Sequence, residues 1–167
     1  LRSVFGVWCE EQDVLHHDYT NKISGMAGNN LGLAGDYHCY HYADIIHAEQ
    51  AQVLATYESD FYQGQPALTV NSYGQGQAYY MASRTNDGFL SDFYNGLSRL
   101  LGLKRALECD LPDGVTAQIR CQGASEYVFL MNFTPEIREV RLPAASFVAL
   151  PGTTPLSGGM VSLPGYG

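Results

Sequence analysis

Residues 60–103 constrain the fold most, because they contain separate signals for two strands, a tight turn and a helix. Residues 66–72 are a β-rich run, and residues 77–83 read as the return strand. Between them, Gly74 and Gly76 supply the positive φ angles that a short hairpin needs. This part of the chain therefore predicts an antiparallel hairpin.

A helix is predicted directly after the hairpin. Asn86 or Asp87 can cap its first turn, and Gly102 is suited to the position just after its end. The apolar residues between these two limits recur with helical period: Phe89, Leu90, Phe93, Tyr94, Leu97, Leu100 and Leu101.

Residues 1–105 as a whole mix strand and helix patterns. Residues 1–15 open with a short strand, residues 21–35 are a Gly/Asn-rich loop, and residues 42–50 are compatible with a helix. Residues 53–57 form a short apolar run, as expected of a buried strand. Strands that alternate with helices predict an α/β layer with a partly parallel sheet, in which the hairpin is an antiparallel edge.

Residues 106–167 have a different texture. Residues 115–121 alternate between apolar and polar side chains, and residues 126–133 are apolar on both faces, as in a central strand. Shorter β-runs follow at 140–142, 147–150 and 160–163, between turns rich in proline and glycine. This part predicts a small antiparallel β-domain.

Charge and length exclude several classes of protein. The 167 residues carry a net charge of −8, which argues against nucleic acid and anionic membrane surfaces as partners. The sequence has neither a membrane-length apolar segment nor a signal peptide. Because it begins at Leu1 inside a patterned segment, we expect a piece of a larger protein.

The cysteines indicate the compartment. Cys9, Cys39, Cys109 and Cys121 are widely spread and form no CxxC pair. This spacing defines neither a disulfide framework nor a zinc site. We predict four reduced thiols in a cytoplasmic protein.

Three stretches of the chain, in order, resemble one family. They are residues 1–15 (LRSVFGVWCEEQDVL), residues 42–61 (YADIIHAEQAQVLATYESDF) and the hairpin–helix segment, and all resemble the back half of bacterial β-galactosidases of glycoside hydrolase family 42. Gln12 departs from the pattern, since the family usually has an aromatic residue there. The matching residues are Phe5-Gly6-Val7-Trp8, Glu10-Glu11, Asp13, Val53-Leu54-Ala55-Thr56-Tyr57, Asp60-Phe61-Tyr62, Gly64, Pro66-Ala67, Thr69, Asn71, Gly74, Gly76, Ala78-Tyr79-Tyr80 and Ala82.

The resemblance implies a fold for each part. Residues 1–105 would be a trimerisation domain of the flavodoxin-like, class I glutamine amidotransferase-like α/β type, truncated at its N-terminal side. Residues 106–167 would be a small antiparallel β-sandwich, truncated at its C-terminal end.

The resemblance also implies a function and partners. The parent enzyme would hydrolyse terminal β-D-galactosides with retention, using two glutamates of a preceding (β/α)8 barrel that this sequence lacks. The present segment would assemble a homotrimer and help wall the active site. Its partners would then be further copies of itself, that barrel and, through the parent enzyme, the β-galactoside substrate. By itself it should be inactive.

Glu10-Glu11 is the one candidate pair of catalytic carboxylates. Retaining glycoside hydrolysis needs two carboxyl groups about 5–5.5 Å apart. Adjacent residues on a strand point to opposite faces, and on a helix they diverge by about 100°. We therefore predict no catalytic residue in this chain.

Histidines and a cysteine gather in residues 38–47. His38 and His41 would share a helix face, with Cys39 and His47 nearby, but tyrosines interleave with them and no HExxH motif is present. The pair His16-His17 lies in a polar stretch and is expected at the surface. No metal site is predicted.

Nucleophilic and cofactor chemistry are also not predicted. An amidotransferase needs a cysteine on a strand-to-helix elbow, and no cysteine here has that context. Cys9 precedes two glutamates, which should raise the pKa of its thiol. The lone Gly74-Gln75-Gly76 lies in a hairpin, so it is not a phosphate loop and no cofactor-binding residue is predicted.

A second hypothesis is a non-catalytic carbohydrate-binding or interaction module. Tyrosine suits both sugar stacking and subunit interfaces, and many tyrosines fall in one region: Tyr37, Tyr40, Tyr42, Tyr57, Tyr62, Tyr73, Tyr79 and Tyr80. A sugar-binding module needs an exposed flat aromatic platform. The only tryptophan, Trp8, lies in an apolar run and is expected to be buried, which disfavours this hypothesis.

Overall fold

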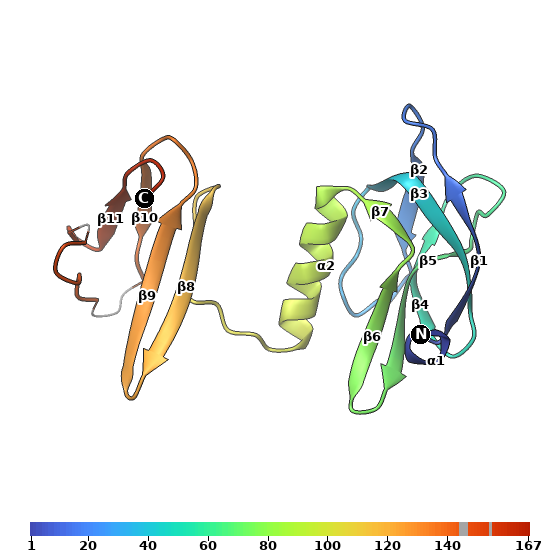
Figure 1. The fold of residues 1–167 in the computed structure, drawn as a ribbon, viewed down its shortest axis with the longest axis horizontal. Coiled ribbons are helices and arrows are strands. Elements are labelled where there is room, and N and C mark those ends of the chain that lie inside the picture. Colours follow the sequence, from blue (N-terminus) through green and yellow to red (C-terminus); the bar gives the residue numbers. More distant parts are fainter. Residues whose placement is uncertain (144–146, 154) are drawn as a thin grey trace. The chain divides into compact units, whose positions relative to one another are not determined.

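The computed structural model describes residues 1–143, 147–153 and 155–167 (Figure 1). The chain divides into two compact units, Leu1–Leu103 and Lys104–Gly167.

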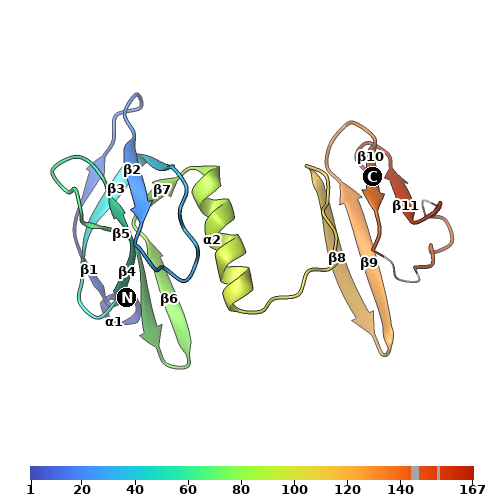
Figure 2. The ribbon, with the colours of Figure 1, turned by 180° about the vertical axis from the view of Figure 1, so that it is seen from behind.

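The first unit contains one sheet and two helices, which Figures 1 and 2 show from opposite sides. All its described strand pairs are antiparallel. Its elements are α1 (Arg2–Phe5), β1 (Val7–Val14), β2 (Asn21–Gly25), β3 (Tyr37–Ala48), β4 (Gln52–Tyr57), β5 (Pro66–Tyr73), β6 (Gly76–Met81), β7 (Ser83–Thr85) and α2 (Asp87–Leu100).

The sheet closes on itself through β7. Cys39 of β3 pairs with Asn21 of β2 on one side and with Thr85 of β7 on the other. The circuit continues from β2 through β4 and β5 to β6. Ala82 then joins β6 to β7, because its amide donates to the carbonyl of Ala67 while its own carbonyl accepts from the amide of Asp44. The ring β3–β2–β4–β5–β6/β7 encloses the core.

The predicted α/β fold of the flavodoxin-like, amidotransferase-like type is therefore wrong. Residues 42–50, expected to be helical, lie mostly in β3, and part of the expected loop at 21–35 is β2. The run at 53–57 pairs antiparallel with both neighbours. Residues 1–15 also differ slightly, because α1 precedes the expected strand.

The hairpin and the second helix are confirmed. β5 and β6 pair up to Tyr73 and Gly76, and Gly74 in the turn has φ 59°. The side chain of Asn86 accepts a hydrogen bond from the amide of Phe89 and caps α2. Gly102 follows the last turn with φ 59°, as expected of a helix terminator.

The core of the first unit consists mainly of apolar side chains and also contains buried tyrosines. The hydroxyl of Tyr57 donates to the carbonyl of Ala82 at 2.9 Å, so the buried phenol also supports the junction between β6 and β7. Burial raises the pKa of Tyr57, so it stays neutral. Other fully buried side chains are Ile23, Leu31, Cys39, Ile46, Leu54, Leu68 and Phe89.

Helix α2 packs on the sheet and on the loop after β2. Phe89 and Phe93 are buried, and the hydroxyl of Tyr37 donates to Asp92 at 2.7 Å. Gly96 lies directly against the carbonyl of Leu31, where a Cβ atom would come within 2.2 Å of the oxygen. A residue without a side chain is therefore needed at this contact.

The described residues of the second unit form two antiparallel strand pairs. β8 (Val115–Gln122) pairs with β9 (Ser125–Asn132), and β10 (Arg138–Arg141) pairs with β11 (Met160–Leu163). Its small core is formed by Val115, Val140, Val161 and Leu163. The antiparallel β-type prediction is consistent with this arrangement.

Two details of the second unit differ from expectation. Residues 126–133 were expected to be a central strand, but β9 pairs only with β8 among the described strands, and Phe129 and Phe133 are exposed. Residues 147–150 form no strand. Apolar residues on both faces therefore do not mark the middle of a sheet here.

Buried Asn132 fixes the end of β9. Its amide nitrogen donates to the carbonyls of Glu136 at 2.7 Å and Pro164 at 2.9 Å. Its side-chain oxygen accepts from the amide and the hydroxyl of Thr134. One side chain thus ties β9 to the turn that follows and to the segment after β11.

Replacing Gly96 should destabilise the first unit. In Gly96→Ala the new methyl group meets the backbone of Leu31, so we expect a loss of about 1–3 kcal/mol despite the better helix propensity of alanine. Urea unfolding followed by circular dichroism measures this difference.

The matched control is Gly88→Ala in the same helix. A Cβ at Gly88 has its nearest neighbour at an ordinary 3.7 Å, so this variant should be neutral or more stable by up to about 1 kcal/mol. Equal stabilities of the two variants would contradict the packing described for Gly96.

Candidate functional site

The two adjacent glutamates lie on β1, at the end of the strand order. The register of β1 against β3 shifts between Cys9 and Glu11, so Glu10 is the extra residue of a β-bulge. An oxygen of Glu10 lies 2.7 Å from Nε2 of His47. Both glutamates are exposed. Glu10 is therefore already paired with His47 through an ion pair or a hydrogen bond. That neither glutamate is catalytic stays a prediction.

Trp8 is exposed, which corrects the expectation that it is buried. Its ring stacks on His47, with ring centroids 5.0 Å apart and an angle of 24° between the planes. Val7 is only 5% exposed, whereas Trp8 is 43% exposed. The apolar run was misleading because successive strand residues face opposite sides, and Trp8 follows Val7 directly.

A polar cluster surrounds Asp44 of β3. Gln12 donates its side-chain amide to one oxygen of Asp44 at 2.7 Å, and the hydroxyl of Tyr80 donates to the other at 2.8 Å. Burial, and then this hydrogen bond, raises the pKa of Tyr80. Gln12, where the family usually has an aromatic residue, thus supplies a polar link from β1 to β3.

The pKa of Cys9 is raised, as the sequence predicted, but for a different reason. Burial makes the largest contribution, followed by the charge of Asp44. Cys39 also has a raised pKa because it is buried in the core of the first unit. Both thiols are therefore weak nucleophiles at neutral pH.

The histidines at 38–47 do not share a helix face. His38, Cys39, His41 and His47 lie on strand β3, where Cys39 is buried and His41 is exposed. His41 has φ 71° at the irregular pairing with β7. The helical spacing that first suggested metal ligands is therefore not realised.

Within the described part of the chain, one group of three potential ligands has atoms within 4.8 Å of one another: His16, His17 and Asp18. Nε2 of His17 lies 3.1 Å from the carboxylate, and Nδ1 of His16 lies 3.8 Å from it. All three side chains are exposed, as expected for His16-His17. The group is too exposed to be held in place, so we assign no metal to it.

The tyrosines divide between core and surface. Tyr37, Tyr57 and Tyr62 are buried, while Tyr73 is exposed at the end of β5. Core packing thus accounts for part of the tyrosine-rich region. Only the tyrosines that are not buried in the core can contact a partner.

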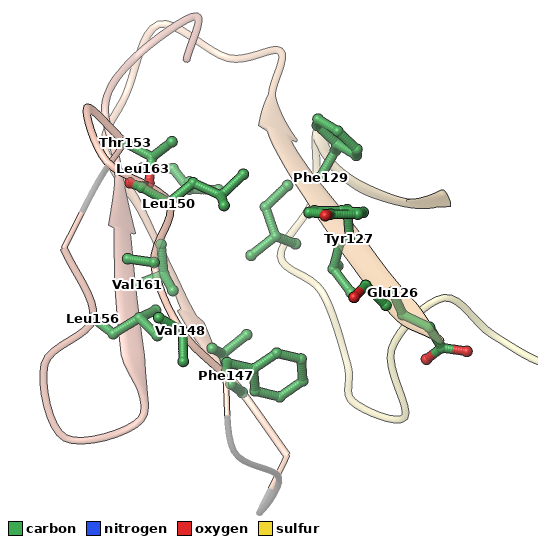
Figure 3. A pocket seen from close by; sticks show the side chains of 15 residues that line it. Glu126, Tyr127, Phe129, Phe147, Val148, Leu150, Thr153, Leu156, Val161 and Leu163 are labelled. Atoms are coloured by element: carbon green, nitrogen blue, oxygen red, sulfur yellow. Dashed lines mark hydrogen bonds between the residues drawn. The ribbon is translucent and has the colours of Figure 1, made fainter. Parts of the chain in front are cut away.

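The second unit has an apolar hollow of about 530 Å³ between its two strand pairs (Figure 3). Tyr127 and Phe129 of β9 line one side, and Leu150, Leu156 and Val161 line the other. With few polar groups converging on it, the hollow offers shape and apolar surface but no reactive chemistry.

Two family models match the chain. The β-galactosidase trimerisation domain matches residues 1–104, and the β-galactosidase C-terminal domain matches residues 114–167. The chain is 51% identical to a β-galactosidase of Clostridium perfringens over 84% of its length, and 45% identical to one of Alicyclobacillus acidocaldarius over its whole length. It spans 20% and 24% of those two relatives.

Solved structures give the same result. The β-galactosidase of Rahnella sp. R3 is 43% identical with a TM-score of 0.82, and that of Bacillus circulans sp. alkalophilus is 36% identical with a TM-score of 0.85. Each alignment covers 99% of this chain and 23% and 24%, respectively, of the solved chain.

The fold and the matches together describe a segment that consists of two β-rich units. The chain belongs to the β-galactosidases of glycoside hydrolase family 42, as the segment that carries trimerisation and C-terminal domain sequence. In the described residues, we find no helix that is both long and apolar enough to span a membrane.

The four cysteines should differ in reactivity. All four are free, with Cys9 and Cys121 exposed and Cys39 buried. In the native protein a thiol reagent should modify Cys121 readily, Cys9 more slowly because its pKa is raised, and Cys39 only after unfolding. Mass spectrometry of alkylated peptides over time measures the order.

The control is the same reaction in denaturant without reductant, where four thiols per chain should react. A count of two or zero would contradict the assignment of four free thiols. Rapid native modification of Cys39 would contradict its burial.

Proposed function

We propose that this chain is the non-catalytic C-terminal portion of a β-galactosidase that hydrolyses terminal β-D-galactosides with retention. The observation that carries the proposal is the match of residues 1–104 to the β-galactosidase trimerisation domain. The names of the relatives support the same activity, since all those compared above are β-galactosidases.

The proposal assigns catalysis to another part of the polypeptide. Retention requires a nucleophile and an acid/base carboxyl group about 5–5.5 Å apart. Glu10 and Glu11 are neighbours at an irregular exposed strand, and Glu10 is engaged with His47. A preceding (β/α)8 barrel would supply both carboxylates, and the present chain would help wall the active site.

The first unit is proposed to assemble a homotrimer. Its family description supports self-association, and its surface carries the exposed aromatic side chain of Trp8. We also place the enzyme in the cytoplasm, because exposed thiols such as Cys9 and Cys121 fit a reducing compartment.

A carbohydrate-binding module remains the second candidate, and one observation favours it. Trp8 is exposed rather than buried, so one aromatic ring is available for a sugar to stack on. As the only tryptophan, Trp8 is also a direct probe of this function. A saturable change in its fluorescence on adding lactose would favour the sugar-binding hypothesis.

Hydrolysis should require the complete polypeptide that carries this chain. The 167-residue chain should not release the chromophore from a nitrophenyl β-galactoside, because the proposal assigns both catalytic carboxylates to the preceding barrel. The complete polypeptide should do so, with β-galactose as the first product by NMR. Activity of the short chain that disappears in Glu10→Gln or Glu11→Gln would contradict the proposal.

Light scattering should give the complete polypeptide three times its chain mass. The physical reason is that a closed ring of identical subunits satisfies every contact surface. The control is a version ending before Leu1, which should lose the trimer if residues 1–104 assemble it. A monomeric complete polypeptide would remove the assembly role.

A further inference from the structure

The outer face of β1 presents an aromatic side chain that is both exposed and fixed. Trp8 stacks on His47, and Nε2 of His47 lies 2.7 Å from an oxygen of Glu10. We call these three residues the Trp8 face. Because the ring is already held in one orientation, covering it costs little side-chain entropy. Rigid, exposed tryptophans are frequent anchors of protein interfaces.

The backbone of β1 beside the Trp8 face does not favour pairing with a further β-strand. β1 is the end strand of the described sheet and pairs only with β3. The bulge between Cys9 and Glu11 interrupts its regular hydrogen bonding, and the charged side chains of Glu10 and Glu11 add repulsion. A partner must therefore dock through side chains.

The chemistry of the face fits a protein better than a sugar. Besides an aromatic ring, a ligand site needs polar groups that converge on the ligand and fix its orientation. Here one oxygen of Glu10 and one ring nitrogen of His47 already bond to each other. The neighbouring hollow is lined by Leu1, Arg2, Ser3, Gly6, Glu49 and Gln50, and Trp8 is not part of it. The side chain of Trp8 is exposed outside this hollow.

We propose that the Trp8 face is the surface on which a second copy of the chain docks in the homotrimer. This inference rests on the proposed assembly function, and the family description assigns that function to residues 1–104, which include all three residues of the face. A ring of three uses heterologous contacts, in which two different surfaces meet. The Trp8 face of one subunit therefore packs against a different surface of the next.

The first test is Trp8→Ala in the complete polypeptide, followed by light scattering over a dilution series. Loss of a central tryptophan should raise the concentration at which the assembly dissociates by at least about tenfold. The control is Tyr73→Ala, which removes another exposed aromatic side chain of the same unit and should leave that concentration unchanged. Circular dichroism checks that both variants are folded.

A second measurement uses the unmodified protein, in case Trp8→Ala does not fold. Hydroxyl-radical footprinting with mass spectrometry reports how accessible Trp8 is. Trp8 should be protected in the assembly and oxidised at least several-fold faster in subunits dissociated by dilution.

Each other outcome overturns the inference in a distinct way. If Trp8→Ala is folded and dissociates like the wild type, the contact lies elsewhere while the assembly function stands. If Trp8 is equally protected in dissociated subunits, it packs within its own polypeptide. Protection that depends on lactose instead would assign the face to a sugar. If the unmodified complete polypeptide does not associate at all, the proposed function itself fails.

Discussion

The fold of the first unit depends on Ala82, where the extended segment of β6 and β7 changes its pairing partner from β5 to β3. Up to Met81 the strand pairs with β5, and from Ser83 it pairs with β3. At the junction, the amide of Ala82 donates to Ala67, and its carbonyl accepts from the amide of Asp44 and the hydroxyl of Tyr57. These bonds satisfy the buried backbone where the ladder changes partner. The closed ring, its core and the outward position of β1 all follow from this step.

The sequence predicted elements whose signals are local. The hairpin needs a glycine in its turn, and α2 needs a cap at Asn86 and a stop at Gly102, so each signal lies within or directly beside the element that it defines. β3 could not be predicted in this way, because Ala43 and Ile46 suit a helix face as well as a strand. Pairing with β1 and β7 decides the question, and those partners lie far away along the chain. The fold class was wrong for this reason.

The family could be identified from short motifs, but the environment of individual residues could not. Trp8 and His47 lie far apart along the sequence. Their stacking depends on the register between β1 and β3. The same register places Gln12 opposite Asp44, where it forms a hydrogen bond. No local pattern encodes a register, because it is set by the way in which the whole sheet closes.

The proposed assembly makes the open edge of β1 a physical problem. Pairing of identical edges can continue from molecule to molecule, whereas a ring of fixed size needs a contact that stops after closure. The bulge at Glu10 and the acidic side chains beside it prevent β1 from extending the sheet. The bulge residue also holds His47, on which Trp8 stacks. The bulge therefore disfavours open-ended pairing of β1 edges, and it also orders the side chains that we propose form the closed contact between subunits.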